Sequence, residues 1–478
     1  MTWSRRAFLK SALVSPVALA FPRSPFAADA ASLGKTYERL GKVAPVPGRA
    51  IETSPLSVGF EVLDRKGFDP ARCYEHVGNL GVKWARCQTG WCRCETVKGE
   101  YDFNWLDDVV DALLEVGVTP WFNLGYGNRL YTPDAPDDFA VGWAPIFSEE
   151  ALAGWLRFTE HLARHFKDRV KHWEIWNEPN ITHFWQPEKP NPEDYARLVA
   201  KTAPVIREQI SDSFIIGAAL AGVRVDYLEG CFENGLGDFV DAISYHPYRA
   251  IPEERYDRDM TALRECVAKY APGLKLWQGE NGCPSVGGPE STGALSQLEW
   301  NETRQAKWLL RRIILDLRYA VDLTSYYHTV DLVGYRGKTN FKGLLRGNDY
   351  TPKPSYFAYQ CLCALFDAAT QRAELGLELI GQEKVHLEEA HFTRNGKALY
   401  AFWFPADLQK AWKPRSLSMA LDTPDGAVLD EPVLVDPLSQ EVFRLAPVRR
   451  DTGKVVFEGL PLLDYPLLIT DAQVVGLA

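Results

Sequence analysis

The feature that most restricts the fold of this chain is a regular alternation of strand-like and helix-like segments between residues 55 and 366. Eight short runs of β-branched and aromatic residues alternate with longer segments whose apolar residues recur at helical spacing. Such an alternation builds either a closed (β/α)8 barrel or an open doubly wound sheet. No Gly-x-Gly-x-x-Gly follows the first strand, which disfavours the nucleotide-binding open sheet. We therefore expect an α/β fold of the (β/α)8, or TIM barrel, class.

The expected elements of this barrel can be given by residue range. The strands are expected at 57–62, 82–87, 119–124, 171–176, 214–219, 241–245, 274–278 and 323–327. The helices are expected at 105–116, 149–166, 192–210, 257–270, 298–319 and 354–366. The spacing of Trp308, Leu309, Ile313 and Leu317 places them on one apolar face of the longest helix. Together these ranges define a catalytic-barrel domain over residues 51–367.

The texture of the sequence changes after the last of these helices. From residue 371 to the end, short alternating runs are separated by turn signals, of which Asn395-Gly396 and Asp425-Gly426 are tight-hairpin dipeptides. This pattern predicts an accessory antiparallel β-sandwich over residues 368–478. Residues 31–50 are expected to be a linker that precedes the barrel.

The N-terminus has the pattern of an export signal. Ser4 to Lys10 reads Ser-Arg-Arg-Ala-Phe-Leu-Lys, an apolar run over 11–21 follows, and Ala28-Asp29-Ala30 is a small-x-small cleavage candidate. Residues 1–30 therefore resemble a bacterial twin-arginine signal peptide. This predicts transfer of the folded protein by the twin-arginine export machinery to the periplasm or the extracellular space.

Composition excludes several kinds of partner. Lys and Arg number 53 against 63 Asp and Glu, a formal net charge of −10, and no basic run occurs beyond the N-terminus. Nucleic acid is therefore not an expected partner. After the signal, no uninterrupted apolar stretch of about 18 residues occurs, so stable membrane insertion of the mature chain is not expected either. Aromatic residues make up 12% of the chain, a composition that suits stacking on sugar rings.

Two glutamates end strands on opposite sides of the expected barrel mouth. Glu178 ends the fourth strand in Asn177-Glu178-Pro179, and Glu280 ends the seventh strand. Active sites of such barrels lie at the carboxyl ends of the strands. Hydrolysis of a glycosidic bond uses two carboxyl groups, one protonated and one ionised, about 5–5.5 Å apart for retention or about 6.5–9.5 Å apart for inversion.

With these residues in place, the sequence resembles the retaining (β/α)8 glycoside hydrolases of clan A and is most similar to glycoside hydrolase family 39. The resemblance covers the barrel and extends to the accessory sandwich. It implies that Glu178 is the acid/base and that Glu280 is the nucleophile. Asn177 would contact the sugar 2-hydroxyl, and Arg86 would keep Glu280 ionised.

The resemblance also assigns the residues that end the sixth strand, His246-Pro247-Tyr248. Tyr248 would orient the nucleophile, and His246 would tune Glu178 or bind a sugar hydroxyl. The sequence departs from the family at the eighth strand, where Tyr327 or His328 replaces the usual Trp, and at Gln88, where a His is common. Both departures concern the pocket for the non-reducing sugar.

Other residues have weaker assignments. Trp91 and Trp185 fall in strand-end loops and are candidate sugar-stacking platforms, although packing is the commoner role of such a residue. Glu174, four residues before Glu178, is expected to be a charge-paired residue inside the barrel. No His and Asp cluster has metal-ligand spacing, so neither a metal nor a cofactor is expected. The nine cysteines are odd in number, and their disulfide state stays open.

The sequence therefore predicts an exported glycosidase that cleaves O-glycosidic bonds of an oligo- or polysaccharide by double displacement. A polysaccharide-binding barrel without activity and a transglycosidase are the alternatives. The sugar, the linkage, and endo or exo action are left open, because the strand-end loops decide them.

Overall fold

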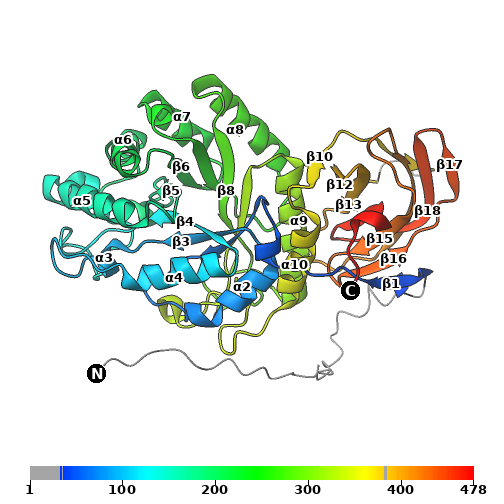
Figure 1. The fold of residues 1–478 in the computed structure, drawn as a ribbon, viewed down its shortest axis with the longest axis horizontal. Helices are drawn as coiled ribbons and strands as arrows, with labels where there is room; N and C mark the ends of the chain where they lie inside the picture. Colours follow the sequence, from blue (N-terminus) through cyan, green and yellow to red (C-terminus); the bar gives the residue numbers. More distant parts are fainter. Residues whose placement is uncertain (1–32, 35, 382–384) are drawn as a thin grey trace, which may run out of the picture.

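The computed structural model describes residues 33–34, 36–381 and 385–478. The predicted signal peptide, residues 1–30, lies outside this described part. The chain forms a barrel wrapped by helices and, beside it, a domain of antiparallel strands that contains the C-terminus (Figure 1). The predicted fold class, a TIM barrel followed by a β-sandwich, is confirmed.

The barrel consists of eight strands that close in chain order, β2 to β9, with every neighbouring pair parallel. These strands are β2 (Leu56–Phe60), β3 (Trp84–Gln88), β4 (Thr119–Leu124), β5 (His172–Ile175), β6 (Phe214–Ala221), β7 (Ala242–His246), β8 (Lys275–Asn281) and β9 (Leu323–Tyr326). Each lies within a few residues of its predicted range. Because all eight strands run the same way, their carboxyl ends meet at one mouth.

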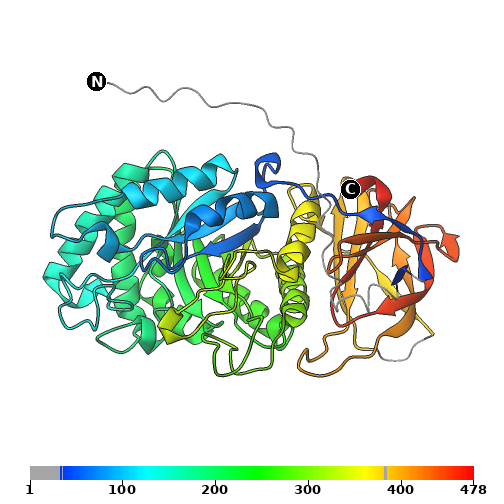
Figure 2. The same cartoon turned by 90° about the horizontal axis from the view of Figure 1, so that it is seen from below.

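Helices follow the strands and cover the outside of the barrel (Figures 1 and 2). They are α2 (Tyr74–Leu80), α4 (Asn104–Glu115), α5 (Glu149–Phe166), α6 (Pro192–Gln209), α7 (Val225–Glu233), α8 (Tyr256–Tyr270), α9 (Glu302–Arg318) and α10 (Pro354–Leu365). Local sequence sets their ends: the side chains of Ser148 and Asn301 cap the first turns of α5 and α9. The short helices α2 and α7 were not among the predicted helices, because each gives too few turns for a periodic signal.

The lower part of the barrel is filled by large apolar side chains. Trp121, Ile216, Ala242, Trp277 and Leu323 form a buried cluster inside the ring of strands. This layer closes the barrel from below, since a barrel of this size is a packed core and not a pore. The charged network of Arg86, Glu174 and Glu280 lies toward the mouth.

The C-terminal domain contains two antiparallel sheets. The larger sheet has the order β1-β16-β15-β19-β13-β12-β10, and the smaller one β11-β14-β18-β17. Their strands are β10 (Thr370–Arg372), β11 (Leu377–Ile380), β12 (Glu388–Arg394), β13 (Lys397–Trp403), β14 (Arg415–Asp422), β15 (Pro432–Asp436), β16 (Glu441–Arg444), β17 (Arg449–Asp451), β18 (Lys454–Leu462) and β19 (Leu467–Asp471). As its dipeptide predicts, Asn395-Gly396 joins the hairpin of β12 and β13.

The remaining strand of the larger sheet comes from the other end of the chain. Residues 31–50 were expected to be a linker, but strand β1 (Arg39–Lys42) lies antiparallel to β16 at the edge of the sandwich (Figure 1). Arg39 also pairs with Glu441 at 3.1 Å. This part of the linker prediction is therefore wrong, because a four-residue strand at a sheet edge has too little apolar pattern to be recognised.

Buried charges hold the barrel and the sandwich together. Arg311 of α9 pairs with Glu253 at 2.5 Å, and Trp403 of β13 donates to the same carboxylate at 2.6 Å. Arg311 also donates to the carbonyl of Ala406 at 2.7 Å. Since the arginine and the glutamate belong to the barrel and the other groups to the sandwich, the sandwich directly supports α9.

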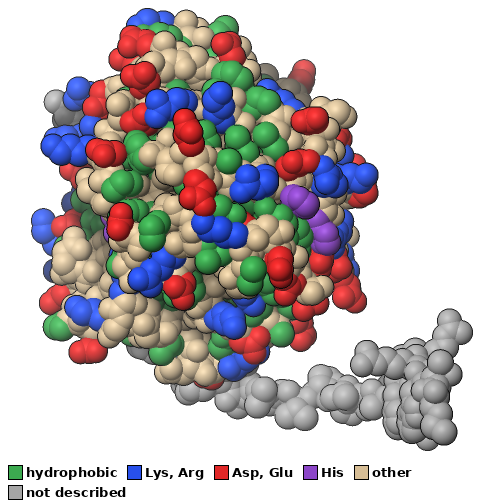
Figure 3. All heavy atoms as spheres, turned by 90° about the vertical axis from the view of Figure 1, so that its left-hand side faces the viewer, with side chains coloured by type: hydrophobic (Ala, Val, Ile, Leu, Met, Phe, Trp, Pro, Cys, Tyr) green, Lys and Arg blue, Asp and Glu red, His purple; other side chains and the backbone are tan. Residues whose placement is uncertain are grey.

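The outer surface of the barrel carries both signs of charge. On the face in Figure 3, Lys and Arg side chains are interspersed with Asp and Glu, and apolar side chains are scattered between them. Among the described residues, no helix has the length and apolar character to cross a bilayer. All nine cysteines are free thiols, and eight of them are buried, which settles the disulfide question left open above.

Candidate active site

Glu178 and Glu280 meet at the barrel mouth. Glu178 follows β5 and Glu280 lies near the end of β8, so their strands face one another across the ring. One carboxylate oxygen of each residue lies within 4.8 Å of the other and of a ring nitrogen of His246. Both side chains are largely buried, with 11% of Glu178 and 16% of Glu280 exposed. The sequence prediction that the fold brings these two residues together is confirmed.

Glu178 is held by an unusual backbone at the end of β5. Trp176 and Glu178 both have positive φ values, 68° and 47°, in the left-handed region that costs a non-glycine residue about 1 kcal/mol or more. The amide of Glu178 donates to the carbonyl of Ala219 at 2.8 Å, at a point where β6 bulges away from β7. Neighbouring strands therefore fix the direction in which this carboxylate leaves the barrel wall.

Two donors surround Glu280. Arg86 donates to Oε2 at 2.7 Å, and the Tyr248 hydroxyl donates to Oε1 at 2.8 Å. Burial is the largest influence and by itself would raise the pKa of Glu280, but the electrostatic effects of His246 and Arg86 and the hydrogen bonds from Tyr248 and Arg86 outweigh it and lower the pKa below its ordinary value. Glu280 is thus held as an ionised carboxylate.

The strand that carries Glu280 depends on a glycine immediately before it. A Cβ atom added to Gly279 would lie 2.2 Å from the Ser244 hydroxyl and 3.1 Å from a carboxylate oxygen of Glu174. Any other residue would push β8 away from β7 and displace Glu280. The register of β8 against β9 also shifts between Gln278 and Asn281, which turns this segment toward the mouth.

The environment of Glu178 differs from that of Glu280. Its Oε1 lies 2.9 Å from Nδ1 of His246, a fully buried residue that ends β7. No arginine or lysine contacts Glu178 among the interactions of the described residues. A histidine partner can give or take a proton, whereas the arginine beside Glu280 keeps a fixed charge. The two carboxylates therefore have different partners, a fixed cation beside Glu280 and an imidazole ring beside Glu178.

Arg86 connects the buried charges of the site. Its guanidinium donates to Glu174, Glu280 and the Asn177 Oδ1, the last at 2.8 Å. Glu174 is completely buried and also accepts from Asn123 at 2.9 Å, which confirms the expectation that it is a charge-paired residue inside the barrel. Because Arg86 occupies Oδ1 of Asn177, the amide donor of Asn177 is oriented away from it.

Glu61 is a member of this network that the sequence analysis did not identify. It follows β2, accepts from Arg86 at 3.2 Å, and lies 3.6 Å from Nε2 of His328. Burial is the main cause that raises its pKa to about 8; Arg86 lowers it, and the negative charge of Glu280 raises it further. The position of Glu61 at a strand end could have indicated a site residue, but Glu61 belongs to no sequence motif.

Lys342 is a second residue that sequence analysis missed. Its amine is buried, lies 5.7 Å above the ring centre of Tyr248, and hydrogen-bonds weakly to Asn340 at 3.5 Å. Burial lowers its pKa to about 8, although Glu280 and Cys283 act in the opposite direction. Lys342 lies in the long segment between β9 and α10, where no sequence pattern indicated a functional residue.

The remaining predicted site residues fall into two groups. Tyr327 lies at the rim of the site, 7% exposed, where Glu280 is among the charges that raise its pKa after the dominant effect of burial. His328 instead faces into the wall: its ring nitrogens lie 3.0 Å from the carbonyl of Val330 and 3.2 Å from that of Glu61. Burial lowers the pKa of His328 to about 4, so the ring is neutral and supports the wall.

The predicted sugar-stacking roles of Trp91 and Trp185 are wrong. Both side chains are completely buried. Trp91 stacks on Tyr131 with ring centres 5.0 Å apart and donates to Glu95 at 2.5 Å, while Trp185 packs edge-on against Trp176. Their loops fold back onto the barrel helices, so these rings form core and present no face to a ligand.

The group of Glu178, His246 and Glu280 also has a spacing that could hold a metal ion. Arg86 lies 2.7 Å from one of the proposed ligands, and a fixed cation at that distance opposes a second one. The bond from Tyr248 occupies the other oxygen of Glu280. The arrangement therefore favours proton transfer and nucleophilic attack over metal binding, and the expected absence of a metal stays a prediction.

A closed barrel with two strand-end glutamates is the arrangement found in the retaining (β/α)8 glycoside hydrolases of clan A, and the chain is similar to that class. Within it, the chain resembles family 39: a sequence model described as glycosyl hydrolases family 39 matches residues 71–270. The matched segment contains Arg86, Asn177, Glu178, His246 and Tyr248 and ends before Glu280.

The chain is similar to two curated relatives and, in fold, to a solved structure. A β-xylosidase of Caldicellulosiruptor saccharolyticus is 25% identical over 294 residues, which cover 55% of this chain and 56% of that protein. A β-xylosidase of Geobacillus stearothermophilus is 26% identical over 32% of this chain and 31% of its own. The chain thus spans about half or less of these relatives. A family 39 glycoside hydrolase from Bacteroides cellulosilyticus superposes with a TM-score of 0.67 at 21% identity, over 90% of this chain and 83% of that one, which shows the shared fold.

Proposed function

We propose that this protein is a retaining glycoside hydrolase in which Glu280 is the nucleophile and Glu178 the acid/base. The observation that carries the proposal is the pair itself: two carboxylates within 4.8 Å, one held ionised by Arg86 and Tyr248 and the other bonded to His246. A separation of about 5–5.5 Å suits retention, while inversion needs about 6.5–9.5 Å for an intervening water.

In the first step, an oxygen of Glu280 attacks the anomeric carbon while the bond from that carbon to the leaving oxygen breaks. Glu178 gives its proton to the leaving oxygen, and a covalent glycosyl–enzyme ester forms on Glu280. Arg86 and Tyr248 hold Glu280 in line, and the oriented amide of Asn177 is available to the sugar 2-hydroxyl. These contacts strengthen as positive charge develops on the sugar ring.

In the second step, water attacks the same anomeric carbon from the side that the leaving group vacated. Glu178, now ionised, takes a proton from this water, and the ester bond to Glu280 breaks. Esterification removes the negative charge of Glu280, so the environment of Glu178 differs between the two steps. His246, at 2.9 Å, is positioned to support both protonation states of Glu178.

The proposed substrate is a β-linked oligo- or polysaccharide. The relatives named above are β-xylosidases, and others that match over shorter stretches carry β-glucosidase names. The departures at Tyr327 and Gln88 leave the particular sugar unassigned. We also propose that the protein is exported through the twin-arginine pathway and digests polysaccharide outside the cytoplasm. A reporter protein fused to residues 1–30 tests this proposal. The reporter should be exported, and the substitutions Arg5→Lys and Arg6→Lys should abolish its export.

Covalent trapping tests the proposed activity. Full-length protein is incubated with activated 2-fluoro-β-xyloside and 2-fluoro-β-glucoside, and the labelled peptide is mapped by mass spectrometry. We expect the label on Glu280. We also expect Glu178→Ala to lose at least about 10²–10⁴-fold in kcat/KM and Glu280→Ala at least as much, because the reaction loses its acid or its nucleophile. Added azide should restore turnover with retention in Glu178→Ala and with inversion in Glu280→Ala.

A matched control is Glu115→Ala, which changes an exposed glutamate on α4 and should keep wild-type rates. Near-wild-type activity of Glu178→Ala or Glu280→Ala would refute the assignment. Binding of oligosaccharide without labelling or turnover across glycosides would identify a non-catalytic binding protein. A transglycosidase would give labelled Glu280 but transfer products at high acceptor concentration.

A further inference from the structure

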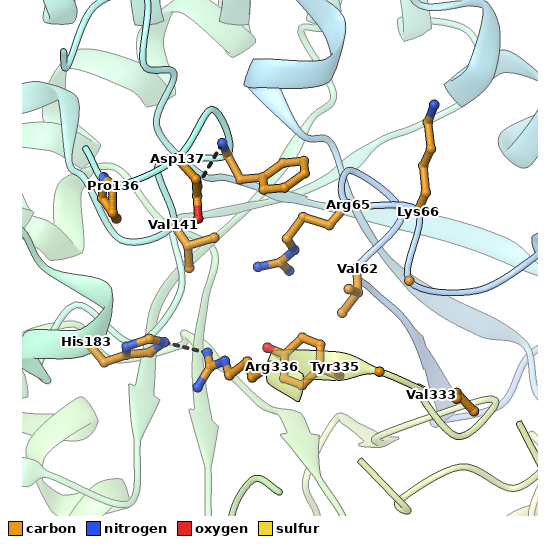
Figure 4. Close-up of a pocket in the computed structure, with 13 residues that line it drawn as sticks. Val62, Arg65, Lys66, Pro136, Asp137, Val141, His183, Val333, Tyr335 and Arg336 are labelled. Atoms are coloured by element: carbon orange, nitrogen blue, oxygen red, sulfur yellow. Dashed lines mark hydrogen bonds between the residues drawn. The ribbon is translucent and has the colours of Figure 1, made fainter. Parts of the chain in front are cut away.

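A cavity opens among the strand-end loops of the barrel mouth. It has a volume of about 490 Å³ and is lined by the loop after β2 (62–67), the loop after β4 (136–141), His183 after β5, and residues 333–336 after β9 (Figure 4). We refer to it as the mouth cavity. All four segments follow the carboxyl ends of strands, the same end of the barrel that carries Glu178 and Glu280. Its size falls in the range of about 300–1,000 Å³ for small-molecule sites.

The charge of the mouth cavity is opposite to that of the chain. Arg65, Lys66 and Arg336 line it, against one carboxylate, Asp137, in a protein whose formal net charge is −10. The guanidinium of Arg65 points into the centre of the cavity (Figure 4). Asp137 is partly engaged, because its Oδ1 accepts from the amide of Phe139 at 3.0 Å.

Arg65 is fixed in this position by its neighbours. It donates to Oε1 of Gln88 at 3.0 Å, and the same oxygen accepts from the amide of Val62 at 2.9 Å. Its Nε lies 3.2 Å from Asp64, which offsets part of its charge. Gln88 is one of the two positions at which the sequence departs from the family, and its side chain here holds a cation of the mouth cavity.

Arg336 is placed on the opposite side of the same space. It hydrogen-bonds to Nε2 of His183 at 2.5 Å, as Figure 4 shows. Burial lowers the pKa of His183, and the charges of Arg336 and Arg65 lower it further, so both cations act on the same region. His183 is therefore a neutral acceptor there and does not add to the positive charge.

One residue joins the mouth cavity to the reaction centre. Tyr327 packs with Val62 and against Tyr335, which both line the cavity. The same tyrosine is influenced electrostatically by Glu280 and by Arg65. A sugar unit in the mouth cavity could thus belong to the substrate whose glycosidic bond lies between Glu178 and Glu280.

We propose that the mouth cavity binds an anionic sugar unit of the substrate, one that carries a carboxylate or a sulfate ester. This inference rests on the proposed glycosidase function. Arg65 and Arg336 supply guanidinium forks suited to either anion, and Lys66 adds a third positive charge. Val62, Val141 and Tyr335 supply the apolar surface against which the sugar ring packs.

Calorimetric titration of the full chain tests this inference. The acid/base variant Glu178→Gln prevents turnover, and three probes are compared: cellotriose, cellotriose oxidised to a carboxylate at C6, and cellotriose sulfated at C6. We expect about tenfold or tighter binding of an acidic probe over cellotriose, and weakening of that preference by added salt. The carboxylate and sulfate probes distinguish the two possible anions.

Variants locate the effect within the cavity. Arg336→Met and Lys66→Met change exposed side chains, so their folding is not at risk, and together they should remove most of the acidic preference. Arg65→Met should do the same, with its thermal unfolding measured in parallel. The matched control Lys338→Met removes an exposed cation from the same loop but outside the cavity lining, and should keep the preference.

The outcomes separate this inference from the proposed function. Equal affinity for all three probes, including no binding of any, would overturn the anionic site, as would wild-type acidic preference in Arg336→Met/Lys66→Met. Fluoroglycoside labelling of Glu280 is scored on the wild-type chain in the same series. Labelling without acidic preference removes only the anionic site, whereas acidic preference without labelling removes only the glycosidase.

Discussion

The floor of the barrel mouth and the cavity above it handle charge in different ways. In the floor, which comprises Glu61, Arg86, Glu174, Glu178 and Glu280, every ionisable side chain is buried or nearly so and bonded to another strand-end side chain. In the mouth cavity, Lys66 and Arg336 stand on loops and remain exposed. The comparison shows that strand ends fix the buried charges of the floor while loops carry the exposed charges of the cavity, a division that fits the proposed roles of bond breaking and recognition.

Among the substitutions in the floor, Arg86→Met should cause the largest loss of activity and stability. It leaves Glu174 and Glu280 buried without their cation, so we expect a loss of about 10²–10³-fold or more in kcat/KM and about 3–5 kcal/mol in the free energy of unfolding. The pKa of Glu280 should rise for the same reason. Kinetics and chemical denaturation measure both effects.

The control for Arg86 is a second completely buried arginine outside the site. Arg312 of α9 pairs with Asp316 at 2.5 Å. Arg312→Met should destabilise the fold by a comparable amount while the folded enzyme keeps its kcat/KM. If both variants lost activity only in proportion to unfolding, the floor would be a structural network and not a catalytic one.

Tyr248→Phe sharpens the comparison within the floor. It removes one donor to Glu280, and a hydrogen bond to a charged group contributes about 1.5–3 kcal/mol, which corresponds to about 10–100-fold in kcat/KM. Since Glu280 acts in its ionised form and loses a stabilising donor, its pKa rises and the acidic limb of the pH profile moves to higher pH.

Tyr245→Phe is the matched control for the hydroxyl. Tyr245 lies on β7, is buried, and bonds to Tyr256 and Met260 away from the carboxylates. It should leave the acidic limb in place. A shift of equal size in both variants would mean that the limb reports packing of β7 and not the bond to Glu280.

Glu61→Gln should have the smallest effect on rate and a clear effect on the pH dependence of stability. With a pKa of about 8 when folded and an ordinary value of 4.5, Glu61 keeps a proton in the folded protein that the unfolded chain gives up. Stability therefore falls as pH rises from about 4.5 to 8, by an amount on the order of a few kcal/mol. Glutamine cannot ionise, so the thermal unfolding temperature of Glu61→Gln should change less with pH across this window than that of the wild type.

Asp436→Asn provides the comparison for a buried carboxyl outside the barrel. Burial raises the pKa of Asp436 from 3.8 to about 6, so the contribution of this residue to the free energy of unfolding decreases only between about pH 3.8 and 6. A wild-type slope between pH 6 and 8 in Glu61→Gln would contradict the assignment of a protonated Glu61.

The sequence predicted the floor far better than the mouth. Glu178 and Glu280 could be placed together because the strand ends of a closed barrel converge. The roles expected of Asn177, Arg86, His246 and Tyr248 came from the resemblance to clan A. Glu61 was not predicted as a site residue because it belongs to no motif. Its importance comes from its three-dimensional contact with Arg86. Lys342 and the mouth cavity depend on loop conformation, which local sequence does not determine.

The two tryptophan errors have the same origin. Trp91 and Trp185 are in strand-end loops, as expected, but each loop turns inward and buries its ring. Strand β1 was missed for a related reason, since its identity as a strand depends on β16 at the far end of the chain.

That pairing has a consequence for biosynthesis. Arg39 and its partner Glu441 are separated by 402 residues, and nearly the whole barrel is synthesised between them. Strand β1 leaves the ribosome before the barrel, yet its docking edge does not exist until β16 has emerged. Closure of the sandwich edge by β1 therefore reports that synthesis has passed residue 444, and a chain terminated before that point would leave residues 39–42 undocked.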